Sequence, residues 1–189
     1  MWQCINDTVM SASASIRTYS YLVKKVVFPV DIIPIISIIA SSFVALFLFV
    51  VSIVVSCLFN YIPNFLQVIY IIIAAYAFMI SFTRFTSAVT TLVPDFAQLL
   101  GIAMQLFFWF TPVVWNLSML ANHPTILTIM KCMPFNYLVT GFRDAFISSN
   151  IVTEGHYIYT IAFWIITTFM FVWGNYIFKK SKKDFADVL

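Results

Sequence analysis

Apolar positions fill the first half of the chain in one long block. No Asp, Glu, Lys or Arg occurs over residues 32–83, a run of 52 residues. At about 1.5 Å of rise per residue, two helical crossings of a hydrocarbon layer of about 30 Å need about 40 residues. A turn-forming cluster at residues 60–64, which contains Pro63, divides the block. The pattern therefore predicts two membrane-spanning helices, near residues 32–59 and 65–82.

Two further apolar runs follow along the chain. Pro94-Asp95 supplies the next break, and an apolar segment then covers residues 96–115. A charge-free stretch over residues 157–178 stops at a lysine-rich tail, residues 179–189. Both runs are long enough for a helix that crosses a membrane. The sequence predicts an all-α integral membrane protein with about four transmembrane helices.

The segment between the last two predicted spans, residues 117–156, is neither a polar loop nor a spanning helix. Its apolar pieces, residues 125–133 and 137–147, are separated by Pro134. About ten residues are too few to cross a membrane but enough for one arm of a hairpin. The segment is predicted to form a helical hairpin on the outer side, either re-entrant or lying flat on the membrane surface as a lid.

Composition agrees with this pattern and narrows the chemistry. The chain is 62% hydrophobic and 9% charged, against about 25% charged residues in an ordinary soluble domain. The four glycines are not clustered, so no phosphate-binding loop is present, and no Ser lies in a GxSxG motif. His123 and His156 are solitary, and Cys4, Cys57 and Cys132 lack metal-ligand spacing. The sequence predicts no catalytic residue, metal or cofactor, and a membrane enzyme is disfavoured.

The four predicted spans also contain no carboxylate. Proton-coupled carriers usually need such a group within the membrane. Uphill transport by this chain would therefore need a driving force supplied by another polypeptide.

The distribution of Lys and Arg predicts the orientation. With the amino terminus inside the cell, eight basic residues fall on the cytoplasmic side and two on the outer side. The positive-inside rule favours this arrangement, and an even number of crossings places both termini in the cytoplasm. The cytoplasmic set is Arg17, Lys24, Lys25, Arg84, Lys179, Lys180, Lys182 and Lys183, and the outer set is Lys131 and Arg143.

An amphipathic segment precedes the first predicted span. At 100° per residue its apolar side chains share one face, and its basic side chains gather on the opposite face. Such a helix could lie on the cytoplasmic membrane surface, with its cations toward lipid phosphates, or could present its polar face to a partner protein. The apolar face holds Ile16, Tyr19, Leu22, Val23 and Val26, and the polar face holds Arg17, Lys24 and Lys25.

Charged residues next to apolar runs are candidates for function. Arg84 follows the second apolar run, where the prediction is a cation that anchors the helix end at the membrane surface. Arg143-Asp144 lies within the outer hairpin, where an unpaired charge would be costly, so pairing or exposure is expected. Gating, or contact with an anionic substrate, is the functional alternative for this pair.

The aromatic block Phe107-Phe108-Trp109-Phe110 ends the third predicted span. Packing is the commoner role for such a block. Stacking against sugar rings is the alternative, and the sequence does not choose between them.

Several motifs, in order, resemble the second half of permeases of type-2 ABC exporters, which export polysaccharides and teichoic acids. Their order and spacing fit over essentially the whole chain, and the Gly-Phe-Arg-Asp end is most similar to teichoic-acid translocation permeases of Gram-positive bacteria. The motifs are Ser15-Ile16 followed by Leu22-Val23-Lys24-Lys25-Val26-Val27-Phe28-Pro29, then Val93-Pro94-Asp95-Phe96, Phe110-Thr111-Pro112-Val113-Val114-Trp115, Met133-Pro134-Phe135-Asn136-Tyr137-Leu138-Val139 and Gly141-Phe142-Arg143-Asp144.

The resemblance implies a homodimeric permease in the bacterial plasma membrane, paired with two copies of a separate ATPase subunit. Residues 1–31 would be the cytoplasmic coupling segment, and residues 32–189 the transmembrane permease domain. The substrate would be a lipid-linked, often anionic glycopolymer, and no nucleic-acid partner is implied. The residues expected to couple to the ATPase are Ser15, Ile16, Arg17, Tyr19, Lys24 and Lys25. Those expected to form a gate or channel are Phe107, Phe108, Trp109, Phe110, Tyr137, Arg143 and Asp144.

The chain also departs from the family pattern. Such permeases usually have six crossings, whereas Met1-Trp2 falls near the end of the expected second span, so the chain looks truncated at its amino end. Met133-Pro134 stands where the family often has Asn-Pro. Two rival functions are a type-2 permease for small lipophilic compounds and a membrane assembly subunit that transports nothing.

Overall fold

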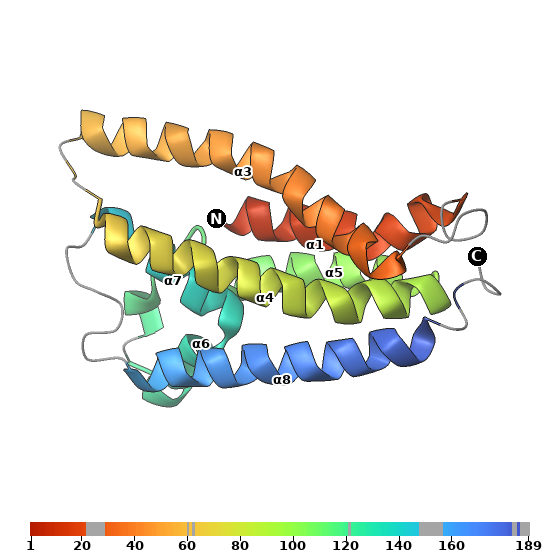
Figure 1. The fold of residues 1–189 in the computed structure, drawn as a ribbon. Helices are drawn as coiled ribbons and strands as arrows, with labels where there is room; N and C mark the ends of the chain where they lie inside the picture. The colour runs from red at the N-terminus through yellow and green to blue at the C-terminus, as the bar shows by residue number, and fades with distance from the viewer. Residues whose placement is uncertain are drawn as a thin grey trace.

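The computed structural model describes residues 1–21, 29–59, 61, 63–120, 122–147, 157–182 and 185. Over these residues the chain is all-α, as predicted, and no strand occurs among them (Figure 1). The elements are α1 Trp2–Thr18, η1 Val30–Ile32, α3 Ile33–Leu58, α4 Phe65–Leu92, α5 Phe96–Phe110, η2 Leu117–Leu120, α6 Pro124–Cys132, α7 Pro134–Ile147 and α8 Tyr157–Ser181.

Three helices in the described part of the chain are long and apolar enough to cross a membrane: Val30–Leu58, Phe65–Leu92 and Tyr157–Ser181. The third predicted span is shorter than expected, because α5 ends at Phe110. Thr111 is extended, with φ −81° and ψ 135°, as the residue before a proline prefers. At about 1.5 Å per residue, the 15 residues of α5 reach about 22 Å. The fourth apolar helix is therefore about three quarters as long as a hydrocarbon layer of about 30 Å is thick.

Helix α4 extends ten residues beyond the end predicted for it. The prediction stopped before Arg84, but α4 continues to Leu92. The continuation is rich in Ser and Thr, whose hydroxyls donate to carbonyls of the preceding turn, such as Thr91 Oγ1 to Ser87 O at 2.7 Å. Hydroxyls satisfied in this way are tolerated inside a helix. Arg84 therefore lies within α4 and not at its end.

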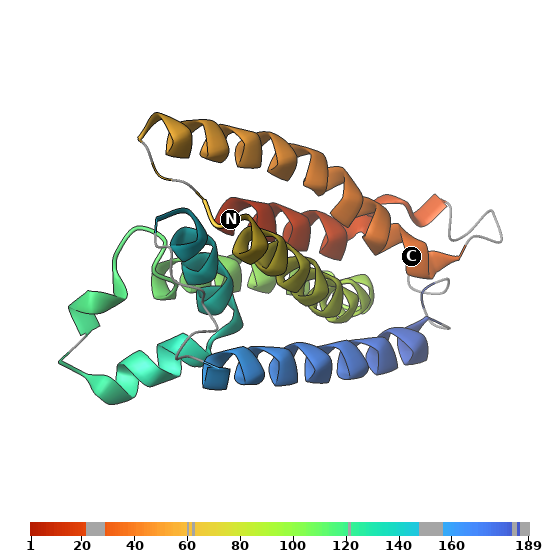
Figure 2. The ribbon, with the colours of Figure 1, turned by 60° about the vertical axis from the view of Figure 1, so that its left-hand side comes forward.

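Helix α1 packs inside the bundle, which differs from the cytoplasmic segment expected over residues 1–31. Ile5, Val9, Ala12 and Ile16 are fully buried, and their spacing of three or four residues places them on one helix face. This face lies against α4, while α3 and α5 flank the helix on either side (Figures 1 and 2). The amino terminus lies near the middle of the length of the bundle (Figure 1).

Helices α4 and α8 run side by side and form the main contact of the bundle (Figure 1). Their closest approach is at Gly174, where an added Cβ would lie 3.1 Å from Ser81 O and 3.2 Å from Phe85 N. Both neighbours are backbone atoms, so neither can move away cheaply. Next to the glycine, the rings of Phe85 and Trp173 stack with centroids 5.0 Å apart.

We expect Gly174→Ala to destabilise the protein by about 1–3 kcal/mol, because the methyl group would overpack the contact between α4 and α8. The matched control is Gly101→Ala, where the added Cβ would meet only Met10 Cε at an ordinary 3.6 Å. Alanine favours a helix equally at both positions, so the difference isolates the close approach. Thermal unfolding in detergent measures it, and equal unfolding temperatures for the two variants would contradict the prediction.

The hairpin predicted over residues 117–156 contains α6 and α7, and α7 runs along the first half of α4. Phe135, at the start of α7, meets Phe78 in the middle of α4 with ring centroids 5.1 Å apart. Ala145 O, near the end of α7, accepts a hydrogen bond of 2.9 Å from Asn64 N at the start of α4. The hairpin thus reaches about half the length of a spanning helix. Of the two predicted alternatives, this geometry favours the re-entrant one.

Candidate functional site

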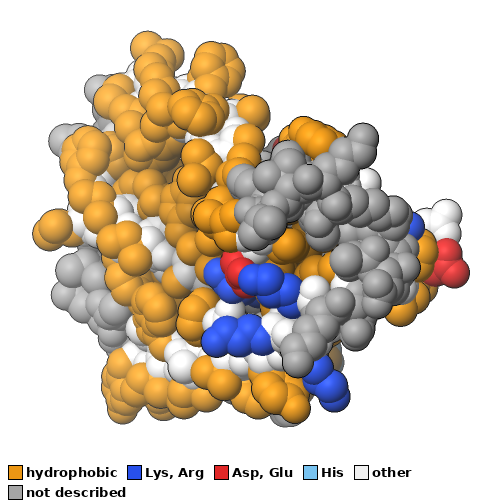
Figure 3. All heavy atoms as spheres, turned by 45° about the vertical axis from the view of Figure 1, so that its right-hand side comes forward, with side chains coloured by type: hydrophobic (Ala, Val, Ile, Leu, Met, Phe, Trp, Pro, Cys, Tyr) orange, Lys and Arg blue, Asp and Glu red, His pale blue; other side chains and the backbone are white. Residues whose placement is uncertain are grey.

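One end of the bundle gathers most of the described basic residues. Here α1 ends, α3 begins and α8 ends (Figure 1). We call it the basic end; its described basic residues are Arg17, Arg84, Lys179, Lys180 and Lys182. Figure 3 looks toward this end and shows blue side chains beside a red one, with hydrophobic side chains around them. Lys131 and Arg143 lie on the hairpin helices at the opposite end.

The residues expected to couple to an ATPase divide into two groups. Ser15 and Ile16 are buried, and Ser15 Oγ donates to Ala12 O at 2.7 Å. Arg17 and Tyr19 are exposed at the basic end. Lys24 and Lys25 lie outside the described residues. The described part of the segment therefore has an anchored inner side and a free outer side, as a docking element needs.

Asp31 joins three elements at the basic end. Its carboxylate oxygens face the Lys182 ammonium group, at the end of α8, and Arg84 Nη1 of α4 at 4.0 Å. The Arg84 guanidinium also lies 5.7 Å from the centre of the Phe178 ring. Asp31 belongs to η1, which leads directly into α3. Arg84 is thus an internal ion-pair partner, which differs from the surface anchor predicted from its position.

A small apolar cluster lies beside these charges. Ile16, Ile33 and Phe178 are almost fully buried together with Phe185. Phe178 and Phe185 meet edge to face, with centroids 5.6 Å apart. The cluster connects the end of α1 with the start of α3 and the end of α8. Movement of the end of α1 would consequently shift the side chains that α3 and α8 pack against it.

The aromatic block at the end of α5 also divides into two parts. Phe107 stacks on Phe135 of α7 at 5.0 Å, and Phe108 lies 5.9 Å from Trp2 of α1. Trp109 and Phe110 are 65% and 54% exposed. Phe107 and Phe108 therefore pack against other helices, whereas Trp109 and Phe110 are accessible to a substrate. Phe107 and Phe108 thus have the packing role, and stacking against sugar rings stays a prediction for Trp109 and Phe110.

Tyr137, expected in a gate, is 4% exposed and lies in a hydrogen-bonded network. Its hydroxyl lies 3.0 Å from that of Tyr70 and 3.1 Å from Thr160 Oγ1, and Trp164 Nε1 donates to the Tyr70 hydroxyl at 3.0 Å. The network ties α4, α7 and α8 together. Tyr137 therefore holds the hairpin in place and presents no surface to a passing molecule.

Arg143 clamps the segment that follows α5. Its Nη2 donates to the carbonyl oxygens of Pro112 and Val113, the latter at 3.1 Å. Trp115 Nε1, from the same segment, donates to Trp109 O at 3.1 Å. Asp144 follows Arg143 on α7 and is half-buried. The arginine thus fixes the position of the carboxyl end of α5 relative to the hairpin.

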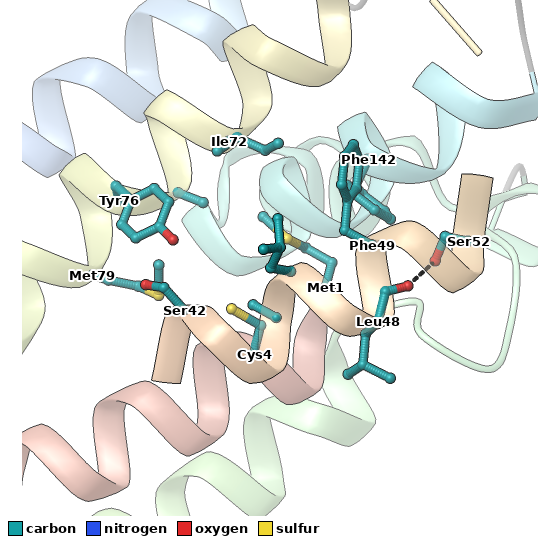
Figure 4. Close-up of a pocket in the computed structure, with 13 residues that line it drawn as sticks. Met1, Cys4, Ser42, Leu48, Phe49, Ser52, Ile72, Tyr76, Met79 and Phe142 are labelled. Atoms are coloured by element: carbon teal, nitrogen blue, oxygen red, sulfur yellow. Dashed lines mark hydrogen bonds between the residues drawn. The ribbon is translucent and has the colours of Figure 1, made fainter. Parts of the chain in front are cut away.

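An apolar cavity of about 150 Å³ lies between α1, α3, α4 and α7 (Figure 4). Its polar lining comes from a few groups, among them Cys4, Ser42 and the Tyr76 hydroxyl. The Ser52 hydroxyl donates to Leu48 O at 2.8 Å, within α3 (Figure 4). A second hollow of about 320 Å³ opens between the end of α3 and α7. Both spaces suit hydrocarbon better than sugar.

Sequence reasoning missed the residues on the outer face of α1. Gln3 and Asp7 are exposed, and Gln3 Nε2 donates to Asp7 Oδ1 at 2.8 Å. Asp7 was not considered as a carboxylate within the membrane, because residues 1–31 were predicted to be a cytoplasmic segment. Ile5, Val9 and Ser13 are buried and lie four residues apart on α1. This spacing was the signal that could have revealed a helix packed in the bundle. Among the described residues, no group of three or more His, Cys, Asp or Glu could hold a metal ion.

The three long apolar helices and the shorter apolar helix α5 fit a multi-pass membrane protein, and comparison with known families identifies its class. Residues 1–147, more than half of the chain, match the family described as the ABC-2 type transporter. The chain belongs to this family and is a transmembrane permease subunit of an ABC transporter. A comparison with curated proteins found no match. Membership implies that a separate ABC ATPase supplies the energy for transport.

Proposed function

We propose that the protein exports a lipid-linked cell-surface polysaccharide or teichoic acid across the bacterial plasma membrane, as a homodimeric permease driven by its ATPase partner. The observation that carries the proposal is that the basic end combines exposed residues with buried residues that pack on the spanning helices. Arg17 and Tyr19 are exposed there, while buried Ile16 connects them to the cluster around Phe178. A movement of the ATPase against this end would therefore displace α1, α3, α4 and α8 together.

The basic end is the cytoplasmic side in this proposal, so α1 and α8 both end toward the cytoplasm. The amino terminus, which was predicted to be cytoplasmic, lies near the middle of the length of the bundle (Figure 1). Five of the described basic residues lie there, and the two on the hairpin helices lie at the other end. The positive-inside rule supports this orientation. Exposed Trp109 and Phe110 support a substrate that carries sugar rings, because aromatic faces stack on them.

Reversing the charge of the coupling segment tests the partner contact. We expect the triple substitution Arg17→Glu, Lys24→Glu and Lys25→Glu to abolish co-purification of the ATPase and export of the surface glycopolymer, since a docking surface does not tolerate reversed charges. The control reverses Lys179 and Lys180, which are exposed at the same end but lie on α8. If the triple variant still forms the complex and retains ATPase activity, the coupling assignment is wrong.

A permease for small lipophilic compounds is the second candidate, because the cavity of about 150 Å³ between α1, α3, α4 and α7 is mostly apolar. Deletion of the gene separates the two. Loss of a surface glycopolymer with unchanged efflux of lipophilic dyes supports the first function, and the reverse result supports the second.

A further inference from the structure

Helix α8 carries a row of aromatic side chains outside the face that packs in the bundle. Its buried residues are Phe163, Thr167, Gly174, Phe178 and Ser181. Phe169, Trp173 and Tyr176 are exposed, and exposed Lys180 follows four residues after Tyr176. Spacings of three or four residues place these side chains on one side of the helix. We call Phe169, Trp173, Tyr176 and Lys180 the α8 row.

Trp173 is held in place by other aromatic rings. Its ring stacks on Phe85 of α4, with centroids 5.0 Å apart, and on Phe169 at 6.0 Å. Phe85 in turn meets Phe96, at the start of α5, edge to face at 6.3 Å. Trp173 precedes Lys179 by six residues, so it lies about 9 Å further from the end of α8. Since a hydrocarbon half-layer is about 15 Å thick, Trp173 lies at acyl-chain depth when Lys179 lies at the membrane surface.

The charges at the basic end are not balanced. This end carries five described cations but only two described carboxylates, Asp31 and Asp95. Asp31 already pairs with two of the cations, and among the described residues no carboxylate forms an ion pair with Lys179 or Lys180. Arg17 is exposed on α1, in the segment proposed to meet the ATPase. The end of α8 therefore presents two positive charges of its own to its surroundings.

We infer that the α8 row and Lys179 bind an anionic phospholipid of the leaflet at the basic end. The ammonium groups of Lys179 and Lys180 attract the phosphate, and the Tyr176 hydroxyl, one turn away, donates a hydrogen bond to the headgroup region. An acyl chain lies along Trp173 and Phe169. A lipid fits this surface because its aromatic part lies at hydrocarbon depth and only its end is charged. The inference does not depend on which substrate is exported.

A lipid bound here would restrain the end of α8. Phe178 is buried there with Ile16 of α1 and Ile33 of α3, and Lys182 pairs with Asp31. The lipid would thus stabilise the contacts between α8 and the other elements of the basic end. We expect bilayers of phosphatidylglycerol to raise the unfolding temperature of the permease by at least about 2 °C over bilayers of phosphatidylcholine, since a lipid that binds the folded state stabilises it.

Quenching of Trp173 fluorescence tests the lipid contact directly. The complex of permease and ATPase is reconstituted in phosphatidylcholine with rising fractions of a phospholipid brominated on its acyl chains, which quenches a tryptophan that it touches. The signal of Trp173 is the difference between the unmodified protein and Trp173→Phe, because both contain the other tryptophans. At low salt we expect brominated phosphatidylglycerol to bind at least about tenfold more readily than brominated phosphatidylcholine, since each lysine at a membrane surface adds about a factor of five.

The charges at positions 179 and 180 should account for this preference. Lys179→Gln together with Lys180→Gln should lower it to about twofold or less and remove the rise in unfolding temperature. Lys179→Arg together with Lys180→Arg should keep both effects, because the charges remain. The matched control is Lys131→Gln, which removes a lysine at the opposite end and should leave the preference unchanged.

Three outcomes would overturn the inference. One is equal quenching by the two brominated lipids in the unmodified protein, as expected if the lysines only favour the helix dipole. Another is a preference that survives the double Gln substitution. The third is loss of the ATPase from the double Gln variant, which would show that this side of α8 docks the partner protein and not a lipid. We expect this variant to co-purify with the ATPase normally.

Discussion

Export is expected to fall at least about tenfold when Asp31 is replaced by Asn, although the protein should still insert in the membrane. The substitution removes the negative charge that holds Arg84 of α4 and Lys182 of α8 against η1. Arg84 then keeps its contact with the Phe178 ring but loses the carboxylate that faces it. The loss of stability should be about 1–2 kcal/mol, which is less than for a fully buried pair because water reaches all three side chains.

Double-mutant cycles can divide this effect between the two cations. Lys182 is nearer to Asp31, which favours a larger coupling energy for Lys182. Arg84 is more buried, with a side chain 19% exposed against 41% for Lys182, which favours a larger coupling energy for Arg84. We expect the larger coupling energy for Arg84, because water and salt screen the lysine more strongly. Unfolding of Asp31→Asn, Arg84→Gln, Lys182→Gln and the two double variants measures both energies. The same export from Asp31→Asn as from the unmodified protein would remove Asp31 from any role in coupling.

Arg143→Ala should also abolish most export, because the segment after α5 loses its clamp on Pro112 and Val113. Two hydrogen bonds from a charged group contribute about 1.5–3 kcal/mol each, and their loss frees Trp109 and Phe110 to take other positions. Arg143→Lys should retain part of the activity, since an ammonium group can still reach one carbonyl but lacks the forked geometry of guanidinium.

The measurement is surface polymer per unit of permease in the membrane. Lys131→Ala is the matched control, because Lys131 is the other described basic residue of the hairpin and only lies over the Tyr159 ring at 5.6 Å. This variant should export nearly normally. Normal export from Arg143→Ala would show that the clamp has no role in the path.

Several features of the fold could be predicted from local sequence. The charge-free run and the break at residues 60–64 predicted α3 and α4, and the actual start of α4 follows Asn64, whose side chain accepts from Gln67 N at 3.4 Å. Pro134 begins α7, where its missing N–H is harmless. These features depend on the hydropathy and dihedral preferences of neighbouring residues, so the sequence carries them directly.

The candidate site was predicted only in part. Arg17, Tyr19, Trp109 and Phe110 are exposed, as substrate or partner contact requires, but no local pattern distinguished exposed Trp109 from half-buried Phe107. Tyr137 bonds to partners on two other helices, which sequence spacing does not reveal. The roles of all these residues in coupling or gating remain proposals that the variants above test.

The sequence by itself determined that this chain is an α-helical membrane protein, because hydropathy over about 20 residues is enough to require lipid. It also determined which end is basic. Only the tertiary structure decided that α1 lies inside the bundle, that Asp31 joins cations 53 and 151 residues away, and that Arg143 holds the end of α5. Such contacts depend on how helices pack across long sequence separations, and the side chains that make them look the same in sequence as those exposed to solvent.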